Sequence, residues 1–313
     1  MPILAPTRQT VIENTPAWLV DIAGFFVPVD PLIALLAVYA LVVIVYARGV
    51  IRRRRRTDIA PAIAFMGGLI GLYLFTQTGL DGLGRRLFFV HRLQHLVLHH
   101  LAPFLIALAL PSAVLAAGLP AGLRRRLARA SAPRLLRLSY RTVQQPVVGG
   151  ALFVGLIALW LTPAVHHWAM ASRAGYWLMN GSMAVEGLAF WWFMLDPRPP
   201  GASTTTHGFG TRIVVLWAVM PPQIAIGAMI TLSPVGLYPG YAVAERAHGV
   251  SAAIDQQIGG LLTWIPPAMM SVIGTLVIMR FAFAHQRATA RSGAVRDDSD
   301  PGENPTSSRS RRS

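Results

Sequence analysis

Seven long apolar stretches divide the 313-residue chain, and each is long enough to cross a lipid bilayer as a helix. A transmembrane helix needs roughly 20 mostly apolar residues to span about 30 Å of hydrocarbon. Charged residues make up 13% of the chain, against roughly 25% in soluble domains, and the mean hydropathy is +0.50. The sequence therefore predicts an all-α integral membrane protein with seven transmembrane helices. The predicted spans are residues 31–51, 60–79, 92–117, 145–163, 175–195, 211–232 and 257–282.

The 28 basic residues are all arginines, and they predict how these spans are oriented. Most of them lie in residues 48–56, in the loops 118–144 and 196–212, and after residue 280, which fall on one side of the seven spans. Because cytoplasmic segments carry the excess of basic residues, we expect the N-terminus outside and the C-terminus in the cytoplasm. Contact with anionic membrane lipids then explains the net charge of +15 without nucleic acid.

The composition divides the chain into three parts. Residues 1–30 are expected to lie in the membrane interface on the periplasmic side, because they combine aromatic and polar residues without a continuous apolar run. Residues 31–283 form the predicted seven-helix membrane domain. Residues 284–313 are polar and read as a disordered cytoplasmic tail.

Histidines in the third predicted span are the strongest functional signal in the sequence. His91, His95 and His99 are four residues apart, so they fall on one stripe of a helix, while His100 points away from it. Two histidines at this spacing can hold one metal ion between their rings. The alternative is that they hydrogen-bond to neighbouring helices or to water. Pro103 in the same span, and Pro111 near its end, predict a kink or a re-entrant end.

The fifth predicted span carries polar and sulfur-containing residues at matching depths. Met179 and Met183 are also four residues apart, and would lie level with His95 and His99. The chain has no cysteine, and imidazole together with thioether is a ligand set that selects Cu(I). Packing is the alternative role for both methionines. Glu186 lies near the midplane, where a carboxyl must be protonated, paired or hydrated, so it either relays a proton or pairs with an arginine or histidine of another helix.

Two further histidines, His166 and His167, follow the fourth span on the outer side. Adjacent side chains on a helix point in different directions, so at most one of the two is expected to join a shared site. The sequence contains no glycine-rich phosphate loop, nucleophile elbow or HExxH motif, and therefore does not read as an enzyme.

Several short motifs follow one another along the chain. They are His91-x3-His95-x3-His99 with Ala102-Pro103, His166-His167, Gly187-Leu188-Ala189-Phe190-Trp191-Trp192, Asp196-Pro197-Arg198-Pro199, Leu237-Tyr238-Pro239-Gly240-Tyr241 and the run from Asp255 to Pro266. Taken in this order, they resemble the CtaG family of cytochrome c oxidase assembly factors, which are seven-helix membrane proteins. The resemblance covers residues 91–283. It implies a bacterial inner-membrane factor that helps to mature haem–copper oxidases, with copper delivery as its usual proposed role.

The chain departs from the family pattern in the fifth span. The family commonly has a histidine there, whereas this chain has Asn180, Met183 and Glu186, and Met183 is the expected substitute ligand. Asp255 matches an acidic position of the family at the outer end of the seventh span. Its alternative role is that of a helix N-cap, which aspartate fills well.

These observations predict an assembly factor without catalytic activity that binds Cu(I) in the outer leaflet and passes it to an oxidase subunit by ligand exchange. His95 and His99 would hold the ion, with His91 or His167 where it enters, and a periplasmic protein is a possible copper donor. One alternative is a membrane electron carrier with two histidines as axial ligands of a b-type haem. A metal-free scaffold for the oxidase subunit is another, and a copper transporter ranks last because few ligands lie below Glu186.

Overall fold

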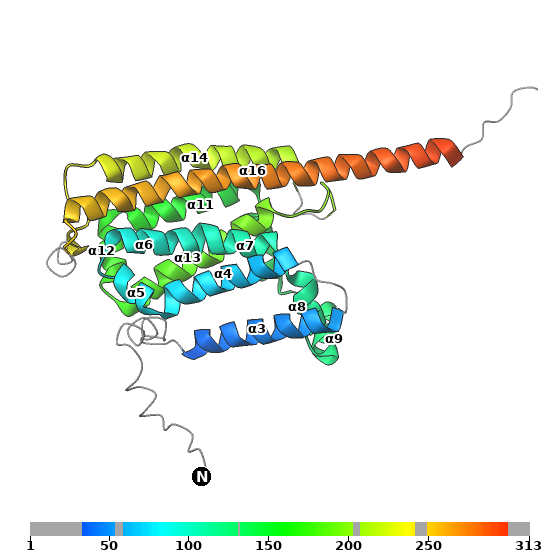
Figure 1. Ribbon diagram of the computed structural model, residues 1–313, viewed down its shortest axis with the longest axis horizontal. Helices are drawn as coiled ribbons and strands as arrows, with labels where there is room; N and C mark the ends of the chain where they lie inside the picture. The colour runs from blue at the N-terminus through cyan, green and yellow to red at the C-terminus, as the bar shows by residue number, and fades with distance from the viewer. Residues whose placement is uncertain (1–32, 54–58, 131, 203–206, 242–248, 300–313) are drawn as a thin grey trace, which may run out of the picture.

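The computed structural model describes residues 33–53, 59–130, 132–202, 207–241 and 249–299, and their regular structure is helical (Figure 1). The predicted segment 1–30 lies outside the described residues. The elements are α3 (Ile33–Arg53), α4 (Ile59–Gln77), α5 (Gly79–Gly84), α6 (Phe88–His95), the π-helix η1 (Leu96–Leu101), α7 (Ala102–Leu108), α8 (Ser112–Gly118), α9 (Ala121–Arg129), α10 (Arg134–Val143), α11 (Pro146–Leu161), α12 (Pro163–Met170), α13 (Arg173–Met194), α14 (Phe209–Leu232), the 3-10 helix η2 (Pro239–Tyr241) and α16 (Ala252–Ser299).

The chain is an all-helical, multi-pass membrane protein. Within the described ranges, α3, α4, α14 and α16 are each long and apolar enough to cross a membrane. The count rises to six if two bent pairs, α6–α7 with α8 and α10 with α11, each form one span. A seventh span would have to be α13, which has 22 residues but contains Asn180 and Glu186 and is therefore less apolar. The predicted count of seven and the predicted orientation both stay predictions.

The predicted kink in the third span is confirmed. Pro103 has no N–H to donate to the carbonyl of His99, so the regular hydrogen-bond pattern fails there, and the π-helix η1 lies directly before it. After Pro111 the chain turns again, and α8 is bent by 72° from the helix that runs from Phe88 to Leu108.

The core is built around α13, which packs against α7, η1, α11 and α12. The C-terminal half of α13 carries Phe190, Trp191 and Met194, which are buried against Phe153 of α11 and Leu216 of α14. Helices α14 and α16 run side by side along one edge of the bundle, and α3 lies at the opposite edge (Figure 1). Close contacts at glycines hold α3 to α8, as expected where helices associate in lipid.

The last helix is longer than expected. Residues 284–313 were predicted to be disordered, but α16 continues without a break to Ser299. The extension contains several alanines, glutamine and arginines, which are good helix formers, and it lengthens a helix that is already formed, so no new nucleus is needed.

Candidate functional site

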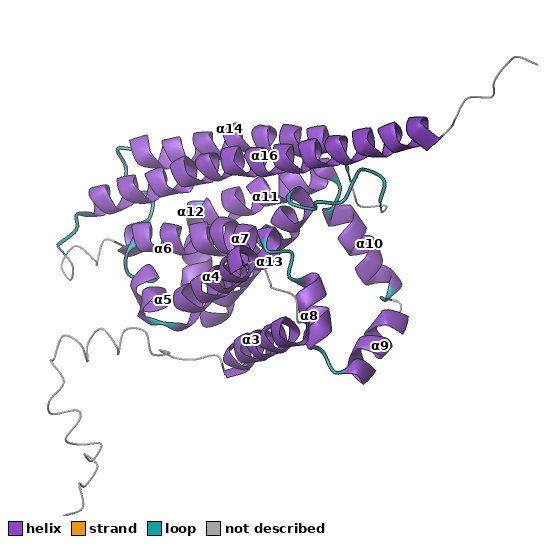
Figure 2. Ribbon diagram, turned by 45° about the vertical axis from the view of Figure 1, so that its right-hand side comes forward, coloured by secondary structure: helices purple, strands orange, loops and turns teal. Residues whose placement is uncertain are grey.

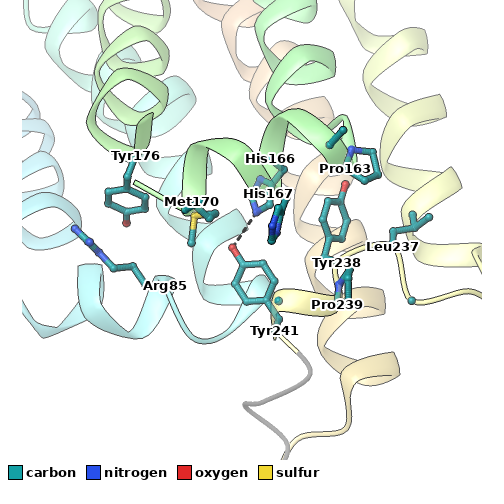
Figure 3. A pocket seen from close by; sticks show the side chains of 14 residues that line it. Arg85, Pro163, His166, His167, Met170, Tyr176, Leu237, Tyr238, Pro239 and Tyr241 are labelled. Carbon is teal, nitrogen blue, oxygen red and sulfur yellow. Dashed lines mark hydrogen bonds between the residues drawn. The ribbon is translucent and has the colours of Figure 1, made fainter. Parts of the chain in front are cut away.

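A cavity of about 690 Å³ opens at the end of the bundle where α5, α12, α13 and η2 meet (Figure 3). We call it the vestibule. Its walls combine aromatic rings with a few polar side chains, so it can hold something far larger than a metal ion. The lining includes Arg85, His166, His167, Met170, Tyr176, Tyr238 and Tyr241.

Four histidines of α6 and η1 form a buried column next to the vestibule, which we call the histidine column: His91, His95, His99 and His100. The rings of His91 and His95 lie 4.4 Å apart between their centroids, and those of His99 and His100 lie 4.8 Å apart. The column therefore consists of two pairs, which we call the upper pair (His91 and His95) and the lower pair (His99 and His100). The ring contacts thus join His91 with His95 and His99 with His100, while the predicted pairing of His95 with His99 around an ion stays a prediction.

His95 is held in one orientation by two neighbours. Its Nε2 lies 3.1 Å from Oδ1 of Asn180, which can only accept, so Nε2 carries the proton. Its Nδ1 is then an acceptor, and Nη1 of Arg92 lies 3.4 Å from it. Arg92 is itself buried, and its Nε donates to Oγ1 of Thr263 at 3.2 Å. A fixed positive charge therefore lies beside the upper pair.

His91 differs from His95 in making no hydrogen bond to another side chain, although it is completely buried, and the backbone of Gly84 is the polar group beside it. Its neighbours are the rings of His95, His166 and Tyr176, the last at a centroid distance of 6.1 Å. A buried imidazole whose hydrogen-bonding capacity is not filled is uncommon and costly, so this ring is available for a ligand.

The two methionines of α13 are both buried and belong to the same apolar cluster, and they differ in that Met183 also lines a small cavity. Met179 packs in an apolar cluster with Phe88 and Tyr176. Met183 lines a cavity of about 10 Å³ that it shares with His95 and His100, among others. That volume is close to the minimum for one water molecule, so an ion would fit there and a macrocycle would not.

Glu186 pairs with a histidine of another helix, which was one of its two predicted roles. Its Oε2 lies 2.6 Å from Nε2 of His99. Both side chains are buried, and the ring of His99 also stacks on Phe153 at 4.2 Å. One oxygen of a carboxyl deep in the bundle is thus paired with an imidazole, while its Oε1 has no hydrogen-bond partner.

Of the adjacent histidines on α12, the structure brings only His166 to the column. Its ring lies 5.1 Å from that of His91, whereas His167 is exposed on the vestibule wall. Burial lowers the pKa of His166 to about 4, so the ring is neutral. Its Nδ1 donates to the carbonyl of Trp160 at 3.0 Å. Its Nε2 accepts from the hydroxyl of Tyr241, also at 3.0 Å (Figure 3). Burial also raises the pKa of Tyr241 well above its usual value, which keeps the hydroxyl protonated as a donor.

Asp255 caps the N-terminus of a helix, but that helix is α6, which is distant from it in sequence. Its two carboxylate oxygens accept from the backbone N–H groups of Phe88 and Phe89, at 2.9 and 2.7 Å. These groups begin α6, whose own N-cap residue Leu87 supplies no side-chain hydrogen bond. Asp255 therefore does not cap its own helix, which begins at Ala252, and instead fixes the start of the histidine column.

We expect Asp255→Ala to lower the free energy of unfolding by about 2 kcal/mol, because two N–H donors of α6 lose their acceptor. Thermal unfolding of the purified protein in detergent measures the loss. Asp255→Asn keeps one acceptor oxygen and should cost less. Equal stability of the Ala variant and the unaltered protein would contradict the capping role.

A polar network beside the column was not singled out from the sequence. Oδ1 of Asp81 accepts from Nε2 of Gln94 at 3.0 Å and from the hydroxyl of Tyr176 at 2.7 Å. Arg85 donates to Oδ2 of Asp81, and its guanidinium lies 4.0 Å from the ring centroid of Tyr176. Asp81 follows the second span, and Gln94 lies between two of the histidines. Polar residues at the ends of spans were therefore the sequence signal that could have indicated this network.

Among the described residues, no three His, Asp or Glu side chains are arranged to hold a metal ion. A metal site in this part of the chain must therefore use fewer imidazoles or include a thioether. His95 and Met183, which line the same small cavity, meet that condition, and the ring of His91 packs against that of His95.

The fold and the site define a multi-pass helical membrane protein with a buried histidine column beside an open vestibule. The sequence pattern of one family, the cytochrome c oxidase caa3 assembly factors (Caa3_CtaG), matches residues 44–284. The chain belongs to this family, which confirms the resemblance found in its motifs. Membership of a family of assembly factors indicates a role other than catalysis.

The chain is also similar to longer mycobacterial proteins. It is 26% identical over 252 residues to an uncharacterized protein of Mycobacterium leprae, which covers 75% of this chain and 36% of the relative. Uncharacterized proteins of Mycobacterium bovis and Mycobacterium tuberculosis are each 26% identical over 266 residues, covering 79% of this chain and 38% of theirs. The chain thus spans little more than a third of the length of these curated relatives. No solved structure matches it.

Proposed function

We propose that this protein supports assembly of a caa3-type cytochrome c oxidase in the bacterial inner membrane by holding Cu(I) and passing it to an oxidase subunit. The observation that carries the proposal is His91, a completely buried imidazole that makes no hydrogen bond to another side chain, beside His95 and next to the vestibule. Cu(I) bound there would satisfy a group that is otherwise costly to bury.

The ligands we assign are His91, His95 and Met183. Asn180 holds the proton of His95 on Nε2, which leaves the Nδ1 lone pair for a metal once the long contact from Arg92 is released. The charge of Arg92 opposes any cation, but it opposes a univalent ion less than a divalent one. Soft ligands and a nearby positive charge both favour Cu(I) over Zn²⁺ or Cu²⁺.

The vestibule is the expected route between this site and a partner protein. His167 and Met170 lie three residues apart on α12 and both line the vestibule, so they offer soft ligands at its wall. His166 lies between that wall and His91. A cuprous ion would exchange ligands along this path without a change in oxidation state, coming from a periplasmic donor and leaving to the oxidase subunit.

Metal analysis of the purified protein tests the proposal. We expect stoichiometric copper, and no haem Soret band, when the protein is purified in mild detergent under reducing conditions. The His91→Ala/His95→Ala variant should lose the copper. A matched variant, His207→Ala/His285→Ala, removes two histidines that lie outside the column and should keep it.

Other outcomes would favour the alternatives. A Soret band that depends on the column would favour a b-type haem carrier, against which the small cavity beside His95 and His100 argues. Absence of copper and iron from the unaltered protein would contradict the metal site. The protein would then act as a scaffold for an oxidase subunit, with its histidines serving structure.

A further inference from the structure

The chain between α8 and α11 forms two short helices that leave the bundle. Figure 2 shows α9 and α10 at its edge, beyond the core helices. No side chain of either helix is buried, and neither contributes to the apolar core. Exposing these two helices to water would be unfavourable, because each carries leucines that have nothing to pack against.

Both helices are amphipathic. In α10, Arg134, Arg137 and Arg141 fall within about 60° of one another around the helix axis. Leu135 and Leu136 lie on the other side, with 75% and 60% of their surfaces exposed. In α9, Leu123 and Leu127 are four residues apart and both are exposed, while arginines occupy most of the remaining surface.

The angle of α10 to the neighbouring helix suits a position in the plane of a membrane. The axis of α10 is bent by 81° from that of α11, and α8 is bent by 72° from the helix before it. A helix that leaves a span at nearly a right angle runs along the bilayer surface. Arg52, at the end of α3, donates to the carbonyls of Ala117 and Leu119 at 3.3 and 2.9 Å, which ties the start of α9 to the end of that span.

The positive charge of α9 and α10 indicates which kind of membrane surface they would bind. The segment 118–144 contains no acidic residue. Its arginines are Arg124, Arg125, Arg126, Arg129, Arg134, Arg137 and Arg141. Guanidinium groups bind phosphate oxygens in bidentate fashion, and basic residues next to a bilayer are attracted by anionic lipids.

We infer that α9 and α10 form a binding surface for anionic lipid, with the leucines at the acyl boundary and the arginines on the headgroup phosphates. An acidic protein surface would satisfy the arginines but would leave the opposite, apolar sides of the helices in water. The interface of an anionic bilayer satisfies both sides at once, which is why lipid is favoured. This surface is separate from the copper site and does not depend on it.

Because the chain has no cysteine, a single Leu136→Cys reporter can carry an environment-sensitive fluorophore in the full-length protein. The labelled protein is reconstituted into vesicles of phosphatidylcholine alone and of phosphatidylcholine with phosphatidylglycerol. We expect blue-shifted emission, protection from iodide and quenching by brominated acyl chains in the anionic vesicles. Removing two arginines with Arg134→Gln/Arg137→Gln should weaken the inserted state about 30-fold.

A matched variant removes the same charge elsewhere. Arg287→Gln/Arg291→Gln alters two arginines of the α16 extension and should leave the emission of the reporter unchanged. Emission that is the same in neutral and anionic vesicles, or an equal loss in both arginine variants, would overturn the lipid assignment. A reporter that stays exposed to iodide in anionic vesicles that contain no other protein would mean that a partner protein, and not lipid, covers the leucines.

Discussion

Gly187→Ala is expected to lower the free energy of unfolding by roughly 3 kcal/mol or more, because α13 contacts η1 through the backbone at this glycine. An added Cβ would overlap the carbonyl of His99 and lie 2.8 Å from its Cα. Backbone atoms cannot rotate away as a side chain can, so the two helices must separate. Thermal unfolding in detergent, followed by the fluorescence of the eight tryptophans, measures the loss.

Gly181, six residues earlier in α13, is the matched control. It is exposed, and a Cβ there would have no atom within 4 Å. Gly181→Ala should therefore leave the protein unchanged or stabilise it by up to about 1 kcal/mol, since alanine is the better helix former. Equal unfolding temperatures for the two alanine variants would show that the approach of α13 to η1 is not tight.

Local features of the third span were predictable because they follow from residues close together in sequence. The spacing of His91, His95 and His99 indicated one buried stripe, and Pro103 and Pro111 indicated the kink. A proline removes a backbone hydrogen bond wherever it stands in the interior of a helix, whatever surrounds it. The π-helix η1, which lies just before Pro103, was not predictable. A π-helix has a different number of residues per turn from an α-helix, so it changes the angles between the histidines around the helix axis.

Partners that come from other helices could not be predicted in this way. His99 pairs with Glu186, and His95 with Asn180, through contacts between residues more than 80 positions apart. His166 rather than His167 meets His91 because Pro163 begins a new helix, α12, after α11 ends, and the angle between them sets which face turns inward.

The same reasoning explains Asp255 and the span count. A sequence shows that an aspartate suits a helix start, but only the tertiary fold shows that the start is that of α6. Hydropathy finds the lipid-facing spans, yet α13 carries the polar partners of the histidine column and so loses the apolar signal. The helix that supplies these polar partners is thus not among the four that are long and apolar enough to be identified as spans by themselves.

His99→Leu is expected to lower the free energy of unfolding by about 3–5 kcal/mol, because it leaves Glu186 buried without its partner. Replacing both members of such a pair with apolar residues removes the unsatisfied group, so His99→Leu/Glu186→Leu should be more stable than His99→Leu alone. Glu186→Gln retains a hydrogen-bonding group toward His99 and should cost less than His99→Leu. A double-mutant cycle from thermal unfolding in detergent gives the coupling between the two residues.

His100 provides the comparison for this cycle, since its ring lies beside that of His99 and contacts the same Phe153. We expect His100→Leu to show much weaker coupling to Glu186→Leu than His99→Leu does. Additive costs for His99→Leu and Glu186→Leu would mean that the 2.6 Å hydrogen bond contributes little to folding. Strong coupling would instead mean that the hydrogen bond between His99 and Glu186 holds η1 against α13. His91 and His95 could then bind a ligand without disturbing how α13 packs on η1.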